Sequence, residues 1–199
     1  CILAGFIMND SMNTLLHNGL TSSIKYEYLY RLNNLEEGTA DQGEGLFQNY
    51  YEVEGSTVQL FAQGIAEHSK YFPDKTDDGE KVDLDKYYLT SAAAETFGVK
   101  SGDEFSFYNI ADLKEHKVKI SGVVTDNTHC YLYTSRENAT KLAGVSTNAY
   151  NCIISKDKLT LDKKRVASET TMTVTADTME NLMQKEEDEQ SCLVYLCCI

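Results

Sequence analysis

Histidine and cysteine are the side chains in this sequence best suited to nucleophilic or metal chemistry. None of the four histidines is spaced with another histidine, a cysteine or a carboxylate as a metal site requires. They are His17, His68, His116 and His129. His129 is followed by Cys130, but a catalytic thiol needs a base from across the fold, and neighbours in one strand point to opposite faces. We therefore predict no catalytic pair here.

The six cysteines form no zinc or redox motif, because no pair has the CxxC spacing. Two of them, Cys130 and Cys152, fall on neighbouring predicted strands. They either meet as a disulfide or remain two buried free thiols, and we favour the free thiols. The other four lie in the apolar ends of the chain: Cys1, Cys192, Cys197 and Cys198.

Glycine and acidic residues offer two further candidate sites. The segment 98–102, GVKSG, precedes a predicted strand and not a helix, so it lacks the helix N-terminus that binds phosphate. We predict a helix stop followed by a turn whose amides bond to Asp103, and a catalytic Asp103 is the minor alternative. Two acidic clusters lack the alternation and glycine of a calcium loop, and we expect them to be solvated faces. They are Asp74, Asp77, Asp78 and Glu80, and Glu186–Glu189.

Tyrosine is abundant, with 13 residues, and tyrosine suits strands and half-exposed surfaces. We expect half of each tyrosine-rich run to lie in the core and half on the surface of a sheet. The alternative is a binding surface. The runs are Tyr26, Tyr28 and Tyr30, then Tyr50 and Tyr51, then Tyr87 and Tyr88.

Composition indicates a globular protein with an acidic surface. The 199 residues are 42% hydrophobic and 25% charged, enough for one sizeable core or a core with a smaller lobe. A formal net charge of -13 repels phosphate, so nucleic acid and anionic lipid are disfavoured as direct ligands.

Hydrophobic patterning predicts an α+β fold with a mixed β-sheet and short helices. The block 86–135 is its centre: Thr90 or Ser91 caps a helix that Gly98 ends, and Ser135 caps a second helix that Gly144 ends. A third helix is predicted over 160–168, and loops over 33–49 and 72–81. The predicted strand regions are 22–31, 48–65, 87–89, 104–108, 118–124, 129–134, 151–155 and 171–175.

Both ends of the chain are apolar. Residues 1–8 and 192–199 carry no charge, but each is shorter than the roughly 18–20 residues that span a bilayer. They are core segments, dimerising strands or the cut ends of two transmembrane helices. Next to them, the apolar spacing predicts amphipathic helices over 9–20 and from Asp177 onward, so two helices flank the domain.

The central block resembles the extracytoplasmic domains of FtsX-like and MacB-like ABC transporter permeases. The runs YYLTSAAAETFGVKSGDEFSF, HKVKISGVVTDNTHCYLYTS and GFIMNDSM, and the strand from Asn148 to Ser155, are similar to segments of that family. The region 33–80 matches none of it. Within the first run, the matching positions are Thr90, Ser91, Ala94, Phe97, Gly98, Val99, Lys100, Gly102 and Asp103.

The resemblance implies that residues 1–20 form a membrane-proximal stalk helix, residues 21–175 an extracytoplasmic domain like the MacB periplasmic core, and residues 176–199 a stalk helix returning into the membrane. The low basic content suits the outer side of a cell membrane. The implied partners are a cytoplasmic ATPase subunit, which would bind the ATP, and a second permease copy. No residue inherits a catalytic, cofactor-binding or metal role, so we expect a protein that is not an enzyme.

In that family, ATP-driven motion acts on an extracytoplasmic substrate or partner, through export of lipid, lipoprotein or peptide, sensing, or control of a cell-wall hydrolase. Two other functions stay open. One is a free-standing soluble binding module that uses the tyrosine-rich strands and the loop 33–49. The other is an extracellular hydrolase that uses His129, Cys130 or the acidic clusters.

Overall fold

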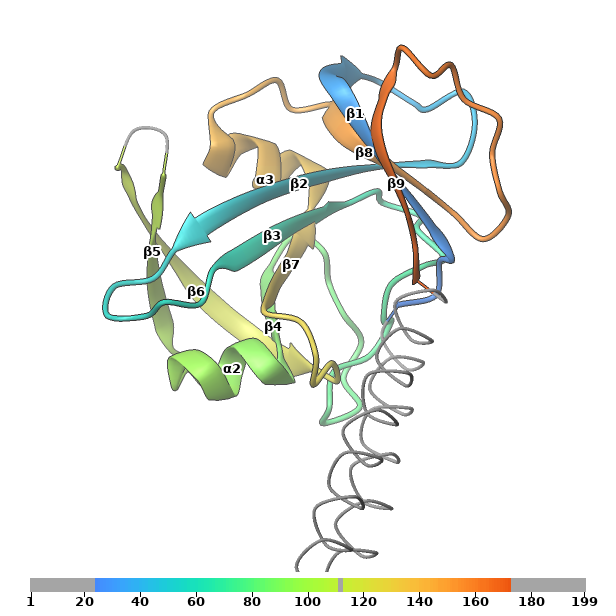
Figure 1. Ribbon diagram of the computed structural model, residues 1–199. Coiled ribbons are helices and arrows are strands. Elements are labelled where there is room, and N and C mark those ends of the chain that lie inside the picture. The colour runs from blue at the N-terminus through green and yellow to red at the C-terminus, as the bar shows by residue number, and fades with distance from the viewer. Residues whose placement is uncertain (1–23, 111–112, 173–199) are drawn as a thin grey trace, which may run out of the picture.

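The described residues, 24–110 and 113–172 of a computed structural model, form a mixed β-sheet with two short helices (Figure 1). The α+β prediction is confirmed at this level. The strands are β1 (Tyr28–Glu37), β2 (Glu44–Glu52), β3 (Leu60–Ile65), β4 (Tyr87–Thr90), β5 (Glu104–Asn109), β6 (Glu115–Val124), β7 (Tyr131–Ser135), β8 (Ala149–Ser155) and β9 (Val166–Thr171). The helices are α2 (Ser91–Phe97) and α3 (Arg136–Ala143).

Six of these strands close into a barrel in the order β3-β7-β4-β6-β5-β2, because β2 pairs with β3 as well as with β5. The pairs β3–β7 and β4–β6 are parallel, and the other pairs around the ring are antiparallel. The seam between β2 and β5 is narrow: it consists of Tyr51 opposite Asn109 and Glu52 opposite Tyr108. Closure leaves the barrel without an open lateral edge.

The remaining strands form a side sheet in the order β8-β1-β9, joined to the barrel through β2. The first residues of β2, Glu44–Leu46, pair with β8, and the following residues from Phe47 pair with β3. Strand β2 therefore belongs to both parts, and β9 is the open edge of the side sheet within the described residues.

Helices α2 and α3 pack at opposite ends of the barrel, and local sequence sets their limits (Figure 1). The hydroxyl of Thr90 accepts the N–H of Ala93, and the hydroxyl of Ser135 accepts the N–H of Asn138, as N-caps do. Gly98 and Gly144 end the helices with φ angles of 66° and 69°, which glycine adopts without strain. These predicted caps and stops are confirmed.

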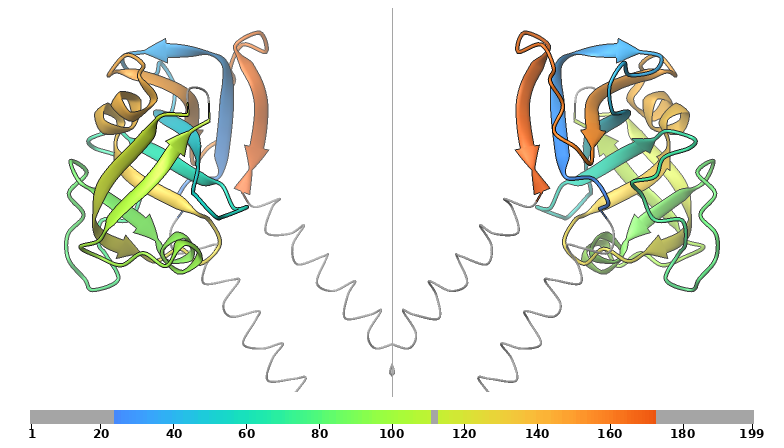
Figure 2. Two further views of the ribbon diagram at one scale, coloured as in Figure 1. Left: turned by 90° about the vertical axis from the view of Figure 1, so that its left-hand side faces the viewer. Right: turned by 90° about the vertical axis from the view of Figure 1, so that its right-hand side faces the viewer.

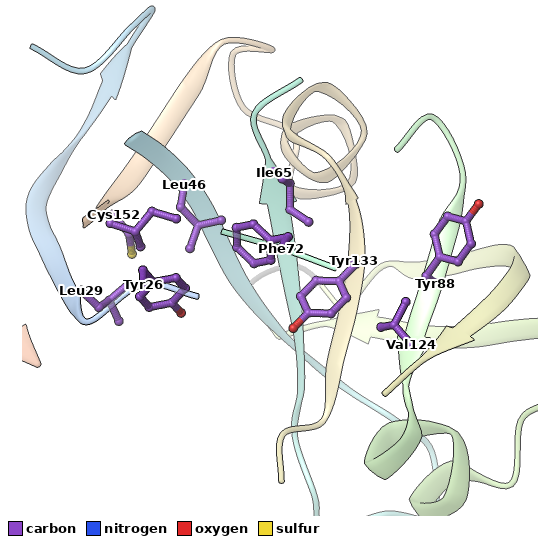
Figure 3. Packing of buried hydrophobic residues seen from close by; sticks show 10 residues of the cluster. Tyr26, Leu29, Leu46, Ile65, Phe72, Tyr88, Val124, Tyr133 and Cys152 are labelled. Carbon is purple, nitrogen blue, oxygen red and sulfur yellow. The ribbon is translucent and has the colours of Figure 1, made fainter. Parts of the chain in front are cut away.

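Three apolar clusters fill the described part. Inside the barrel, the side chains of Leu60, Ala62, Leu89, Ile120 and Leu132 are fully buried. A second cluster lies against the outer wall of the barrel and joins the side sheet to the segment after β3; Figure 3 shows its members, including Tyr26, Phe72, Tyr133 and Cys152. A third lies on the side sheet around Tyr30, Tyr150 and Ile153.

The predicted loop 33–49 is wrong. Strand β1 continues to Glu37 and β2 begins at Glu44, so only a short turn remains between them. The second half of β1 is polar because it is largely exposed in the side sheet, which removes the apolar alternation. Gly45 marks close packing and not a loop, since a Cβ atom there would lie 2.9 Å from Cγ of Tyr150.

The predicted helix 160–168 is also wrong. Residues 160–165 are irregular and 166–168 belong to β9, and Leu161 and Val166, with the preceding Leu159, pack against the side-sheet cluster. Several strand limits move as well: the first strand begins at Tyr28, and the last ends at Thr171 within the described residues. The predicted strand region 48–65 divides into the end of β2 and the whole of β3, and Val58 between them is 42% exposed.

The predicted flanking helices over 1–20 and 176–199 lie outside the described residues. The described helices α2 and α3 are both too short and too polar to cross a bilayer.

Candidate functional site

His129 and Cys130 precede β7 and contact different partners. The imidazole Nδ1 of His129 is 3.3 Å from each carboxylate oxygen of Asp126 and 2.8 Å from the hydroxyl of Thr128. The thiol of Cys130 donates to the hydroxyl of Thr96 over 3.7 Å. The structure therefore does not join His129 and Cys130 as a base and a nucleophile.

Asp126 organises the turn before β7. Its buried carboxylate accepts the backbone N–H groups of Thr128 at 3.0 Å and His129 at 3.1 Å. Its backbone carbonyl accepts the N–H of Ala92 at 2.9 Å, which fixes the start of α2. This turn explains why β7 begins at Tyr131 and not at His129 as predicted. The arrangement is structural.

Burial favours the protonated forms of the Cys152 thiol and the Tyr131 phenol. Burial raises the pKa of the Cys152 thiol to about 11 and that of Tyr131 to about 12. A thiol with a raised pKa is a poor nucleophile at neutral pH, and a neutral phenol acts as a hydrogen-bond donor and acceptor. Both Cys130 and Cys152 are free thiols, but only Cys152 is fully buried, so the prediction of two buried thiols holds for one.

The Gly98–Gly102 segment is a turn, as predicted. The carboxylate of Asp103 accepts the N–H of Lys100 at 2.9 Å, and Gly102 has a φ angle of 93°. Asp103 is committed to this turn, which supports its structural role.

The other predicted histidines and acidic residues are dispersed. His116 packs against the rings of Tyr51 and Phe107, each 5.8 Å away, while His68 is exposed and His17 lies outside the described residues. Asp74, Asp77, Asp78 and Glu80 are exposed as predicted, and Glu186–Glu189 lie outside the described part. In the described ranges, no three His, Cys, Asp or Glu side chains are placed to hold a metal.

An ionic clamp at Arg165 holds the side sheet, and the sequence analysis missed it. The guanidinium donates two hydrogen bonds of 2.6 Å to Glu36 and one of 2.8 Å to Asp41. Tyr150 donates to the same Glu36 carboxylate at 2.8 Å. These hydrogen bonds from Arg165 hold the pKa of Glu36 below its ordinary value. No spacing rule links residues 36 and 165, so no local signal could reveal the clamp.

A polar cleft of about 590 Å³ lies between the segment 81–85, the end of β3 and the start of α3. Charged side chains of both signs line it, including Glu67, Lys81 and Arg136. The guanidinium of Arg136 lies over the ring of Tyr150 at 5.8 Å. Such a lining suits water and polar groups better than an apolar ligand.

The described chain begins and ends at one place, which we call the base. The N–H of Met172 donates to the carbonyl of Glu27 at 2.9 Å, and Tyr28 is paired with Thr171. Ile24 and Met172 also pack against the same apolar cluster. The start of β1 and the end of β9 lie side by side in Figures 1 and 2.

Comparison with known proteins adds no relative: no protein-family model matches the chain, and no curated protein matches it.

Proposed function

We propose that this chain is the extracytoplasmic domain of an FtsX-like or MacB-like permease subunit in a cell membrane. The domain conveys ATP-driven motion to a substrate or partner outside the cytoplasm. The proposal starts from the resemblance of the central block and of the GFIMNDSM run to that family.

One structural observation supports this proposal most directly. An outer domain inserted between two membrane helices must receive and return the chain at one place, and the base has this geometry through Met172 and Glu27. A free-standing protein has no such requirement, although its ends also often lie close together.

A route for motion follows from the strand order. A shift at the base acts first on β1 and β9, then on β8 through β1, and then on β2. Because β2 is also a wall of the barrel, displacement of the side sheet reaches the barrel through covalent and hydrogen-bonded structure. A rigid-body shift of this kind needs no catalytic residue in the domain.

The described contacts of the candidate catalytic residues do not form a catalytic pair. His129 is held in the Asp126 turn, and the Cys130 thiol donates to Thr96. In the proposed assembly, ATP binds to a separate cytoplasmic ATPase, a second permease copy completes the transporter, and an acidic chain of net charge -13 has no nucleic acid partner.

Membrane topology tests the proposal on the full gene product. Leu113, at the β5–β6 connection, is 74% exposed. In a background with the native cysteines replaced by serine, Leu113→Cys should react with a membrane-impermeant maleimide on intact cells or spheroplasts. The detergent-solubilised protein should also co-purify with an ATPase subunit.

Two results would contradict the proposal. One is labelling of Leu113→Cys only after lysis, which places the domain inside the cell. The other is recovery of the untreated gene product in the soluble fraction, which favours the free-standing binding module.

A further inference from the structure

A ladder of aromatic rings crosses the outer wall of the barrel. His129 stacks on Tyr131 with ring centroids 4.9 Å apart, Tyr131 meets Phe61 at 6.2 Å, and Phe61 meets Tyr50 at 6.3 Å. Tyr50, Phe61 and Tyr131 are opposite one another in β2, β3 and β7, so their side chains share a face. Tyr50 is 49% exposed, and the other three rings are partly exposed.

A polar row lies next to this ladder on the same face. Gln48, Gln63 and Tyr133 are again opposite one another, two residues along each strand. Gln63 is fully buried, and Tyr133 and Gln48 are 1% and 8% exposed. Within the described residues, four atoms of the row have no hydrogen-bond partner: Gln48 Oε1, Gln63 Nε2, Gln63 Oε1 and the Tyr133 hydroxyl.

Unpartnered buried polar atoms are unusual, because each has lost its hydrogen bonds to water without gaining others in the fold. Four of them in three neighbouring residues, beside a partly exposed aromatic surface, indicate a feature retained for binding. We propose that the ladder and the polar row together form a binding site for a neutral carbohydrate chain. This inference does not depend on attachment of the domain to a membrane.

The chemistry of the row favours sugar hydroxyls over other ligands. It offers both acceptors, the two glutamine carbonyls, and donors, the Gln63 amide and the Tyr133 hydroxyl. Sugar hydroxyls are also donors and acceptors, whereas the prolines of a proline-rich peptide have no N–H to donate. A flat sugar face would pack on the exposed ring of Tyr50, since Tyr131 is already stacked on His129 and meets Phe61 edge-on.

Two other ligand classes fit less well. An extended peptide cannot add a strand here, because β3 is paired on both sides within the barrel. An anionic ligand is disfavoured by the Asp126 carboxylate beside His129 and by an overall charge of -13, which oppose the attraction that His129 in the ladder and Arg31 near Tyr131 could supply.

The Tyr133 end of the polar row is covered by Phe72. Its ring packs against Tyr133 at 5.5 Å and against Tyr26 at 6.1 Å, in the cluster drawn in Figure 3. A sugar chain would bind first along the exposed ladder. It would reach the polar row when the Phe72 side chain moves aside.

Isothermal titration of the full chain with two neutral probes tests the site: a β-1,4-linked N-acetylglucosamine hexamer and a β-1,4-linked glucose hexamer. At least one should bind, and Tyr50→Ala should weaken that binding about fivefold to tenfold, as loss of an aromatic contact does. Leu35→Ala is the matched control, because Leu35 on β1 is 49% exposed, as Tyr50 is. This variant should bind the hexamer with the affinity of the wild type. Failure of both hexamers to bind, or equal loss in both variants, would overturn the proposal.

A second variant separates binding from folding. Gln63→Met removes the unpartnered amide and keeps its volume, so the urea midpoint should rise while affinity for the hexamer falls about fivefold or more. A lower midpoint with unchanged affinity would show a structural amide and overturn the role of the row. Tighter binding of a decaproline peptide or a sulfated hexasaccharide than of the neutral hexamers would replace the proposed ligand class.

Discussion

The barrel and the side sheet differ in their strand edges: the barrel is closed, and the side sheet has an open edge within the described residues. The barrel closes on itself around side chains such as Leu89, Ile120 and Leu132, which are fully buried. The side sheet stays open at β9, where four consecutive residues are exposed, and the Arg165 clamp ties it together. Burial therefore stabilises the barrel and also β1 and β8 of the side sheet, where Tyr30, Tyr150 and Ile153 are buried, while polar contacts contribute more at β9.

This difference matters for the proposed function. The base belongs to the side sheet, so motion would enter the molecule through its less constrained part. The β9 edge has few buried side chains, and such an edge opens more readily than a closed core. The barrel, with the ladder on its outer wall, would then move as one rigid body when the side sheet shifts.

Substitutions in the core should give the largest difference in the free energy of unfolding between the barrel and the side sheet. Ile120→Ala in the barrel should lower the free energy of unfolding by about 2–5 kcal/mol, because it leaves a cavity among fully buried neighbours. Val166→Ala, at a half-buried position of β9, should lower the free energy of unfolding by about 1 kcal/mol or less. Urea unfolding followed by circular dichroism measures the stability of both variants. Equal losses of stability would contradict the proposed difference between the barrel and the side sheet.

The Arg165 clamp should give a smaller, pH-dependent effect. Arg165→Met should lower the free energy of unfolding by about 1 kcal/mol at pH 7. Hydrogen bonds from Arg165, and then from Tyr150, hold the folded pKa of Glu36 below its ordinary value. The stabilisation is therefore present above an unfolded pKa of about 4.3 and is lost as the pH falls through the folded pKa.

Urea unfolding at pH 7 and at about pH 3 checks this prediction, since the difference between wild type and Arg165→Met should shrink in acid. Lys158→Met is the control, because the ion pair of Lys158 with Glu169 is exposed and should contribute less than about 0.5 kcal/mol. A pH-independent difference would show that Arg165 acts through packing.

The smallest effect is expected at the open edge. Ser168→Lys on exposed β9 should change the free energy of unfolding by less than about 0.5 kcal/mol. It should reduce self-association at high concentration, since lysine on an edge strand hinders pairing with another chain. Light scattering and urea unfolding measure the two effects. A large loss of stability would mean that the edge is covered.

Local features of the fold could be predicted from the sequence, because their causes lie within a few residues. Thr90, Ser135, Gly98 and Gly144 cap or end their helices through contacts no more than four residues away. The turn around Asp103 is local in the same way.

The features that the sequence analysis missed depend on distant partners. The polar half of β1 is a strand because β8 pairs with it. The segment 160–165 is irregular, and 166–168 is strand, because Arg165 and Leu161 are held by the side sheet and β9 pairs with β1. The sequence predicted only part of the ladder, because it identified Tyr50 as one of two adjacent tyrosines. Its alignment with Phe61 and Tyr131 depends on the register of three strands.

The sharing of β2 between the two parts has a consequence for folding kinetics. Leu46 pairs with Cys152 about a hundred positions along the chain, while Phe47 pairs with Gly64 close by. Pairing of β2 with β3 closes a short loop, so it loses little chain entropy and can form early. Pairing of β2 with β8 closes a loop of about a hundred residues and loses more. We expect slow refolding in which the side sheet docks late, onto a β2 strand that the barrel has already set in place.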